Sequence, residues 1–255
     1  MKVTFLGTGT SQGMPVISCK CEVCTSINEK DKRLRSAILI EIDDNVFVID
    51  AGPDFRQQML REDICKLTAI ILTHEHRDHI AGLDDIRAFN YIHKKPVDVY
   101  AESRVLKAVE HEFFYAFKED KYPGIPEMNL NIITEEPFQI EGVRIIPIRG
   151  LHYKLPVLGF RINDFVYLTD LNHIPESEFT KLQNVNTLVI TSLRKKKHVS
   201  HFCLSESLEI IKKVNPQKAY LTHISHQLGL FDEVSKEIPE NVYLAYDRLV
   251  LEVLV

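Results

Sequence analysis

The stretch that decides the fold is Ala69-Ile70-Ile71-Leu72-Thr73-His74-Glu75-His76-Arg77-Asp78-His79. Its first half is short, continuously apolar and rich in β-branched residues, which predicts a buried strand. Its second half holds three histidines in six residues, whereas 11 histidines in 255 residues would place roughly 0.26 of one in such a window. The histidines therefore follow the carboxyl end of a strand, where open α/β sheets place their functional groups.

These side chains are of the types that bind metals. Neutral imidazoles and carboxylates are ligands of divalent transition metals. In an extended or turning backbone, His74 and His76 point to one side while Asp78 and His79 can reach past it. The loop can therefore serve two ions rather than one. The alternative is a charged surface loop, which the density of histidines disfavours.

A site for two metals needs about seven or eight protein ligand atoms, so further ligands must come from elsewhere in the chain. Three candidates stand at the ends of predicted strands: His152 after Ile145–Ile148, Asp170 after Val166–Leu168, and His223 after Tyr220–Leu221. The second half of the chain also repeats the first in outline. The hairpin that closes on Asp170 resembles the one that closes on Asp50, and the strand before His223 resembles the strand before His74.

A second cluster lies in the loop at about residues 15–27, where Cys19, Cys21 and Cys24 are spaced by two and three residues. Three thiolates so placed can bind one zinc and leave a fourth position to be filled. His226 need not face the same ion as His223, so it is free to be that fourth ligand. This predicts a structural zinc site. The alternatives are a chance cluster of buried thiols and a solvated His226.

Length and composition set the limits. The chain of 255 residues is 45% hydrophobic, enough for one large domain or two small ones, and because no Gly-, Ser- or Pro-rich linker divides it, we expect a single domain over residues 1–255. The net charge of -5 gives no electrostatic reason to expect general binding to nucleic acids or anionic membranes. We expect no secretory signal, and no apolar run approaches the roughly 20 residues that span a bilayer. Five cysteines, three of them clustered, suit a metal site in the reducing cytoplasm.

The remaining pattern predicts alternating strands and helices. Strands are expected at Lys2–Leu6, Arg35–Ile42, Val46–Ile49 and Val97–Tyr100, and helices at Asp54–Glu62, Asp84–His93, Glu102–Phe117 and Leu204–Lys213, with a loop at residues 121–126. Two similar α/β halves predict two mixed sheets packed face to face, with helices outside. The glycine-rich turn Gly7–Gly13 lacks the lysine of a nucleotide-binding loop, so nucleotide binding is rejected there.

The histidine cluster, with His152, Asp170 and His223 following in that order, resembles the metallo-β-lactamase superfamily of binuclear metallohydrolases. The stretch Gly7–Pro15, the three-cysteine loop and Thr222–His226 narrow the resemblance to the PhnP-type cyclic phosphate phosphodiesterases, which are similar to the tRNA 3′-end processing endonucleases. The resemblance covers nearly the whole chain. It implies the metallo-β-lactamase fold, an αββα sandwich of two mixed sheets flanked by helices.

The resemblance also implies roles for individual residues. One ion would be held by His74, His76 and His152, the other by Asp78, His79 and His223, with Asp170 bridging both; Cys19, Cys21, Cys24 and His226 would hold a structural zinc, and Asp50 would lie beside the ligands. His201 falls where these phosphodiesterases carry a histidine that assists the leaving group, and it would act in catalysis together with Asp78. His198 is the alternative. His201 is preferred because the predicted helix Leu204–Lys213 begins just after it.

The implied activity is hydrolysis of small phosphodiesters, cyclic ones included, by a hydroxide shared between two ions, zinc or manganese. Arg194–Lys197 could attract a substrate phosphate, but a run of like charge is more often a solvated loop. The rival activities are tRNA 3′ processing, hydrolysis of a thioester or lactone, and non-catalytic metal binding. Nucleic acid is a less favoured substrate, no membrane partner is expected, and a homo-oligomer stays open.

Overall fold

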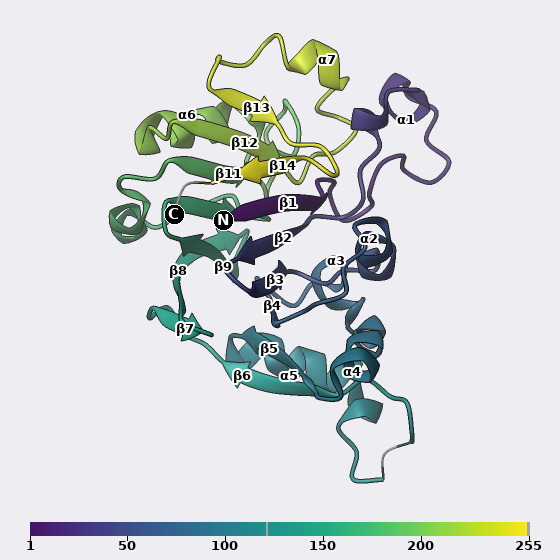
Figure 1. The fold of residues 1–255 in the computed structure, drawn as a ribbon. Coiled ribbons are helices and arrows are strands. Elements are labelled where there is room, and N and C mark those ends of the chain that lie inside the picture. The colour runs from purple at the N-terminus through teal and green to yellow at the C-terminus, as the bar shows by residue number, and fades with distance from the viewer. Residues whose placement is uncertain (121, 254–255) are drawn as a thin grey trace.

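The structure is a computed structural model that describes residues 1–120 and 122–253, and it contains two seven-stranded β-sheets packed face to face (Figure 1). The first sheet has the strand order β14-β1-β2-β3-β4-β5-β6. Its strands are β1 (Lys2–Gly7), β2 (Ala37–Ile42), β3 (Asn45–Ile49), β4 (Ala69–Ile71), β5 (Val97–Ala101), β6 (Met128–Ile132) and β14 (Val250–Glu252). The strands β2 and β3 form an antiparallel hairpin, and β3 to β6 run parallel.

The second sheet repeats this plan with the order β13-β12-β11-β10-β9-β8-β7. Its strands are β7 (Phe138–Ile140), β8 (Val143–His152), β9 (Leu155–Ile162), β10 (Phe165–Leu168), β11 (Thr187–Thr191), β12 (Lys218–Thr222) and β13 (Val242–Leu244). Here β9 and β10 form the antiparallel hairpin, and β10 to β13 run parallel. Because β8 is antiparallel to β9, its carboxyl end lies on the same side as that of β10.

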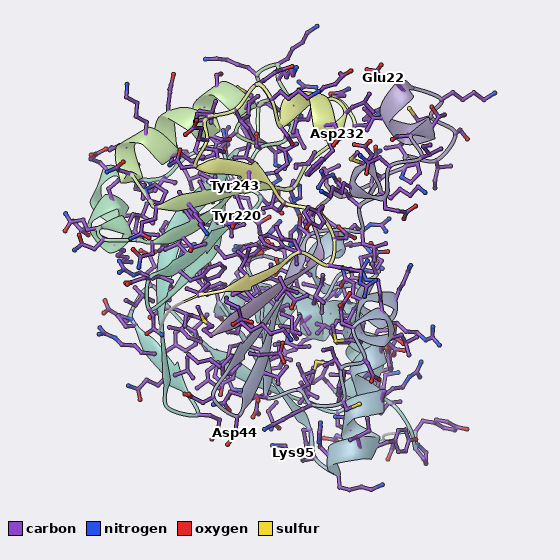
Figure 2. The ribbon with its side chains drawn as sticks, turned by 45° about the horizontal axis from the view of Figure 1, so that its top comes forward. Glu22, Asp44, Lys95, Tyr220, Asp232 and Tyr243 are labelled. Carbon is purple, nitrogen blue, oxygen red and sulfur yellow. The ribbon has the colours of Figure 1, made fainter. Side chains whose placement is uncertain are left out.

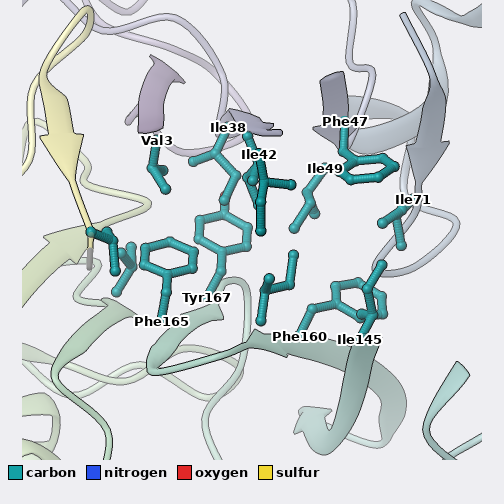
Figure 3. Close-up of a cluster of buried hydrophobic side chains, with 14 of the residues drawn as sticks. Val3, Ile38, Ile42, Phe47, Ile49, Ile71, Ile145, Phe160, Phe165 and Tyr167 are labelled. Atoms are coloured by element: carbon teal, nitrogen blue, oxygen red, sulfur yellow. The ribbon is translucent and has the colours of Figure 1, made fainter. Parts of the chain in front are cut away.

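The inner faces of the two sheets meet in an apolar layer (Figure 3). Phe47 and Ile38 come from the first sheet, and Phe160, Phe165 and Tyr167 come from the second. All five side chains are at most 1% exposed. Burial of each such side chain is worth about 1.5–3 kcal/mol relative to leaving it in water, so this layer fixes how the sheets face each other.

Helices cover the two outer faces. The helices of the first half are α2 (Phe55–Arg61), α3 (Arg77–Ile80), α4 (Arg87–His93) and α5 (Ser103–Glu112), and those of the second half are α6 (Leu204–Val214) and α7 (Phe231–Val234). Phe55, Phe89 and Val105 pack with the outer residues of the first sheet, and Ile211 and Val234 pack with those of the second. The expected αββα sandwich is therefore confirmed.

The helix α1 (Glu22–Thr25) belongs to neither layer. In Figure 2, Glu22 of α1 lies at the rim of the molecule, on the same side as Asp232 of α7. The loop after α1 is bound to α7, because Asn28 Nδ2 donates to Asp232 Oδ2 at 3.2 Å and the Phe231 amide donates to Asp31 Oδ1 at 2.8 Å. The amino-terminal loop is thus fixed against the carboxyl-terminal part of the second sheet.

Several expected boundaries were wrong. The helix expected at residues 84–93 begins as a 3₁₀ turn at Leu83–Ile86, and the one expected to reach residue 117 ends at Glu112. The strand expected at residues 145–148 continues to His152 because β8 pairs with β9 along its whole second half. The strand β11 was not expected, although Thr187–Thr191 is continuously apolar between its threonines. It is β11, not β12, that holds in the second sheet the place of β4 in the first.

In the part of the chain that the structure describes, every helix is too short or too polar to cross a membrane. Residue 121, within the expected loop at residues 121–126, lies outside the described residues. The organisation of residues 1–255 as a single domain stays a prediction.

Candidate metal centres

Strand ends bring the predicted ligands together. Asp50 follows β3, His74 follows β4, His152 is the last residue of β8, Asp170 follows β10, and His223 follows β12. These five strands all end on one side of the sandwich, so residues far apart in the sequence meet there. The two sheets are also joined at this point, because the Leu158 amide of β9 donates to the Thr73 carbonyl at 3.1 Å.

The second half of the histidine cluster is not a loop. His76 is extended (φ -61°, ψ 145°), and the chain then turns into the short helix α3, which carries Asp78 and His79. The Ala51 amide donates to the His79 carbonyl at 2.8 Å and fixes α3 against the turn after β3. Gly52 permits this approach, since a Cβ there would overlap the Asp78 carbonyl oxygen. The helix, rather than backbone alternation, separates Asp78 and His79 from His74 and His76.

Three of the strand-end residues have left-handed backbones, with φ of 68° at Asp50, 58° at Asp170 and 57° at His223. This conformation is costly for residues other than glycine, and it persists at functional sites where the surroundings impose it. At Asp170 the surroundings include Thr191, whose Oγ1 accepts a hydrogen bond from the Asp170 amide at 2.5 Å. The backbone turns at these strand ends, where the side chains of His79 and His223 lie 2.9 and 3.4 Å from Asp170.

Asp170 lies at the centre of the cluster and is 2% exposed. Its Oδ2 lies 3.2 Å from His74 Nε2 and 2.9 Å from His79 Nε2. Its Oδ1 lies 3.4 Å from His152 Nδ1 and from His223 Nε2. Three groups of closely spaced ligand atoms share Asp170: the first adds His74 and His76, the second His79 and His223, and the third His152 and His201. One carboxylate thus faces imidazoles from both sheets.

Several of these buried atoms lack hydrogen-bond partners among the described residues, namely His74 Nε2, Asp170 Oδ1 and both ring nitrogens of His223. A buried polar atom left without a partner costs about 1–3 kcal/mol. Two ligands about 2.0–2.1 Å from one tetrahedral ion lie roughly 3.4 Å apart, which is close to the 3.2 and 3.4 Å that separate Asp170 from His74 Nε2 and from His223 Nε2. The donor set and its geometry therefore fit divalent metals.

Asp50 and Thr73 orient two of the imidazoles. Asp50 Oδ2 lies 2.7 Å from His79 Nδ1, and Asp50 Oδ1 accepts a hydrogen bond from the Thr73 amide at 2.9 Å. The Thr73 hydroxyl bonds both Asp50 and His74 Nδ1, at 2.9 Å in each case. With the Nδ1 atoms so occupied, each ring presents Nε2 to Asp170, as in a carboxylate–histidine–metal arrangement. Asp50 lies beside the ligands, where the resemblance expects it, whereas no pattern in the sequence pointed to Thr73 or Thr191.

Charge in the cluster is strongly coupled. Burial lowers the pKa of His74, and it lowers the pKa of His223 to about 3, so both rings are neutral at pH 7. Burial would also lower the pKa of His79, but the charges of Asp78 and Asp50 outweigh it and hold that pKa well above the usual value. Burial opposes ionisation of Asp170 too, yet the surrounding histidines hold its pKa well below the usual range. The carboxylates of Asp50, Asp78 and Asp170 therefore favour a positive charge between them.

The cluster opens to solvent at His76, which is exposed, and at Asp78, whose side chain is 12% exposed. His152 is half-buried, and its Nδ1 lies 2.8 Å from the Ser200 carbonyl oxygen. Nδ1 therefore carries the ring proton, which leaves the Nε2 lone pair of His152 available. The imidazoles of His76 and His152 lie with their centroids 5.0 Å apart, at the mouth of the cluster.

His201 also reaches the cluster. It is 9% exposed, its Nδ1 lies 2.9 Å from Asp170 Oδ1, and its ring centroid lies 4.5 Å from that of His152. His198 lies one ring further out, 5.1 Å from His201 between centroids, and its Nδ1 accepts a hydrogen bond from the Ser200 amide at 3.3 Å. His198 is half-buried rather than part of the exposed basic run, yet His201 is the one that contacts the buried carboxylate.

The second cluster forms as the spacing predicts. His226 Nδ1 lies 3.3 Å from Cys19 Sγ, 3.3 Å from Cys21 Sγ and 3.5 Å from Cys24 Sγ. Ligands at about 2.3 Å for sulfur and 2.0–2.1 Å for nitrogen would lie roughly 3.5 Å apart around a tetrahedral zinc, so the four atoms fit that ion. The Cys24 amide lowers the pKa of Cys21 to about 6, whereas burial raises the pKa of Cys24 to about 11.

The glycine-rich turn Gly7–Gly13 supports both clusters. Gly9 bridges Arg35 on one side and Ile224 on the other, and the Ile224 amide donates to the Thr8 carbonyl at 2.9 Å. The turn therefore pairs with the segment between His223 and His226. Its backbone groups are used in this pairing, and the close approach requires glycine, because a Cβ at Gly7 would overlap the Arg35 carbonyl oxygen.

Comparisons with known proteins agree with this geometry. A family model described as a β-lactamase superfamily domain matches residues 45–224, which contain the predicted ligands of the His/Asp cluster from His74 to His223. An octanoyltransferase of Porphyromonas gingivalis is 37% identical over 252 residues, which are 98% of this chain and 51% of that protein. The chain thus spans about half the length of that curated relative. A ribonuclease Z of Methanococcus maripaludis is 24% identical over 303 residues, 94% of this chain and 93% of that protein.

One solved structure is similar throughout. The crystal structure of a diphosphatase from the PhnP family is 35% identical in sequence and superposes with a TM-score of 0.93. The superposition covers 100% of this chain and 98% of that one. With this coverage and TM-score, the metallo-β-lactamase fold expected from the motifs is confirmed.

Proposed function

The chain belongs to the β-lactamase superfamily, and we propose that it is a metal-dependent hydrolase of small phosphodiesters, cyclic ones included. The observation that carries the proposal is the meeting of imidazoles from both sheets around Asp170, with unpaired ring nitrogens of His74 and His223 turned toward it. Such a convergence of neutral imidazoles and carboxylates is typical of a binuclear centre.

The proposed ligand assignment is the one that the resemblance implies, and it extends the groups His74, His76, Asp170 and His79, Asp170, His223 by one residue each. His74, His76 and His152 would hold one ion, Asp78, His79 and His223 the other, and Asp170 would bridge them. In support, His79 Nε2 lies 3.1 Å from Asp78 Oδ2 and the rings of His76 and His152 are neighbours. The ion could be zinc or manganese, since imidazole and carboxylate accept both. Cys19, Cys21, Cys24 and His226 would hold a structural zinc.

Two divalent ions bound there would lower the pKa of a water toward about 7 and offset the charge of the phosphoryl oxygens. The chain's own residues supply the rest. Asp50 holds the proton on His79 Nδ1 and keeps Nε2 aimed inward. Exposed His76 and the partly exposed Asp78 leave one side of the cluster open to a small substrate.

His201 is proposed as the acid that protonates the leaving oxygen, a step typically worth about 10² to 10⁴ in rate. Its Nδ1 is directed at Asp170, so its Nε2 is the nitrogen available to substrate. His198, which packs against it, is the alternative acid. A third role for His201, as a metal ligand, is chemically open because its Nδ1 has no hydrogen-bond partner among the described residues.

The substrate class is supported by the diphosphatase with 35% identity. A diphosphate diester and a phosphodiester share one feature, a phosphorus with two bridging oxygens and one negative charge. The test is a screen of the metal-loaded protein against a cyclic nucleotide, bis(p-nitrophenyl) phosphate, a dinucleoside diphosphate and a phosphomonoester. We expect turnover of at least one of the first three and little of the monoester. Absence of all phosphodiester and diphosphate hydrolysis would overturn the proposal.

A second candidate is hydrolysis of a carboxylic or thiol ester, favoured by the octanoyltransferase relative, a protein named for transferring an eight-carbon acyl group. Octanoyl thioesters belong in the same screen, and faster metal-dependent turnover of these would replace the phosphodiesterase proposal. A third comparison is precursor tRNA, because of the ribonuclease Z relative. We expect no cleavage of precursor tRNA, since the chain carries no glycine-rich or basic insertion that would grip it.

A further inference from the structure

The segment Leu193–Leu204, which we call the His201 loop, is a closed loop at the mouth of the His/Asp cluster. Two backbone hydrogen bonds close its base, from the Leu193 amide to the Phe202 carbonyl at 3.0 Å and from the Leu204 amide to the Arg194 carbonyl at 2.9 Å. Everything between them, including His198 and His201, has no helix or strand of its own. His201 directly precedes Phe202, whose amide donates to the Leu171 carbonyl at 2.9 Å, so His201 stands between this fixed base and the loop's tip at Lys196 and Lys197.

The guanidinium of Arg194 holds that tip. Its Nε donates to the Lys196 carbonyl at 3.1 Å and its Nη2 to the Lys197 carbonyl at 2.9 Å. Its Nη1 donates to Gln227 Oε1 at 2.8 Å. Three nitrogens of one planar group are thus used within the protein, in a fork that an ammonium cannot reproduce. A guanidinium so engaged is poorly placed to serve as a docking cation for substrate.

The third of these bonds connects the loop to the Cys/His cluster, because Gln227 directly follows His226. A second connection runs through Ser225, whose amide and hydroxyl both donate to the Leu193 carbonyl, at 3.0 and 2.9 Å. The residues on either side of His226 therefore both bind the base of the His201 loop. Whatever fixes His226 against the three cysteines also fixes the loop.

The other side of the loop touches the His/Asp cluster. The Ser200 carbonyl lies 2.8 Å from His152 Nδ1, and Asn172 Nδ2 donates to the Val199 carbonyl at 3.1 Å. The next residue is His201, 2.9 Å from Asp170. The His201 loop thus contacts both clusters. Arg194 lies on the side of the cysteines, and His201 lies on the side of Asp170.

We propose that Arg194, braced by Gln227, is a positioning residue that sets His201 for the reaction, so that the Cys/His cluster acts on catalysis through the His201 loop. This inference rests on the proposed function only for its kinetic readout. In this inference the charged side chain of Arg194 holds the loop together. It does not attract the substrate phosphate, which was the role considered for the basic run Arg194–Lys197. Lys196 is the matched control, because its side chain is exposed and only its carbonyl bonds Arg194.

The experiment compares Arg194→Lys, Gln227→Ala, Gln227→Glu and Lys196→Ala in the metal-loaded protein. Arg194→Lys keeps the charge but loses the fork, so kcat should fall roughly tenfold with KM unchanged. Gln227→Ala should give a smaller loss of kcat, and Gln227→Glu, which keeps an acceptor oxygen, should restore it. Lys196→Ala should match the wild type. In a His201→Ala background, Arg194→Lys should cause no further loss, because the residue it positions is gone.

Hydrogen exchange of the His201 loop supplies a readout that does not need turnover. We expect faster amide exchange across the loop in Arg194→Lys and Gln227→Ala, with the wild-type rate in Lys196→Ala and with unchanged exchange in the sheets. Unchanged loop exchange, additive effects of Arg194→Lys and His201→Ala, or a rise in KM shared by Arg194→Lys and Lys196→Ala would overturn the inference. If the wild type hydrolyses no substrate, the proposed function fails. Amide exchange then tests by itself whether Arg194 and Gln227 hold the His201 loop.

Discussion

The two clusters of metal-ligating residues differ in how the fold makes them. The His/Asp cluster consists of seven residues, which stand at or near strand ends of both sheets and on the helix α3. Its central members are buried. The Cys/His cluster draws three residues from one half-exposed loop and the fourth from His226. The segment Thr222–His226 serves both, since His223 turns to one cluster and His226 to the other. Strand ends hold the ligands of the first cluster, whereas the cysteines stand on a loop that hydrogen bonds of Asn28 and Asp31 tie to α7.

The difference predicts that the clusters can be emptied separately. Replacing Asp170 by Ala removes the residue shared by both ligand groups of the His/Asp cluster, so turnover should fall by roughly 10⁴-fold or more. The two catalytic ions should be lost while one zinc per chain remains on the cysteines. Elemental analysis together with turnover measures both effects. Loss of the zinc as well would show that the clusters depend on each other for folding.

The next largest effect is expected at the boundary of the His/Asp cluster. His201→Ala should keep all bound metal and lose about 10² to 10⁴ in kcat, because the acid is removed but no ligand is. His198→Ala is the matched control and should lose far less. If His201→Ala gives up one ion per chain, His201 belongs among the ligands instead, and the cluster has one more member than proposed.

A smaller effect is expected behind the ligands. Asp50→Asn keeps the shape of the side chain but weakens its hold on the proton of His79 Nδ1. Metal affinity at the His/Asp cluster should fall roughly 10- to 100-fold. Titration with a metal-binding competitor measures the loss, and affinity at the cysteines should stay constant. An affinity equal to that of the wild type would show that Asp50 does not support metal binding by His79.

The last effect, which is the smallest when counted per pH unit, concerns zinc affinity at the cysteines, and the Asp170→Ala variant isolates it. Because burial raises the pKa of Cys24 to about 11, that thiol is protonated in the metal-free protein at neutral pH and must release its proton to bind zinc. Zinc affinity should therefore rise about tenfold per pH unit between pH 7 and 9 from this thiol alone. Competition against a chelator at several pH values tests this. A pH-independent affinity would mean that Cys24 is already a thiolate.

The difference between the clusters also explains what the sequence could predict. Strand-end residues such as Asp170 and His223 could be found because apolar runs mark where strands end, and parallel strands end on one side. The cysteines could be found from local spacing alone. The fold class followed from the alternation of elements in two similar halves.

Other features depend on contacts between distant segments, which local patterns do not encode. The turn of α3 is induced by packing against Gly52, so the sequence indicated a loop where Asp78 and His79 stand on a helix. The roles of Thr73 and Thr191 depend on the fold, which brings their hydroxyls to Asp50 and to the Asp170 amide. Arg194 looked like part of a solvated basic run, because its partner Gln227 lies 33 residues away.

The central claim is that residues from both sheets converge on a pair of ions, and anomalous diffraction from crystals of the metal-loaded protein tests it most directly. The account predicts three peaks per chain, two of them about 3.5–4 Å apart on either side of Asp170 and one between His226 and the cysteines. A single peak beside Asp170, or none there, would contradict it.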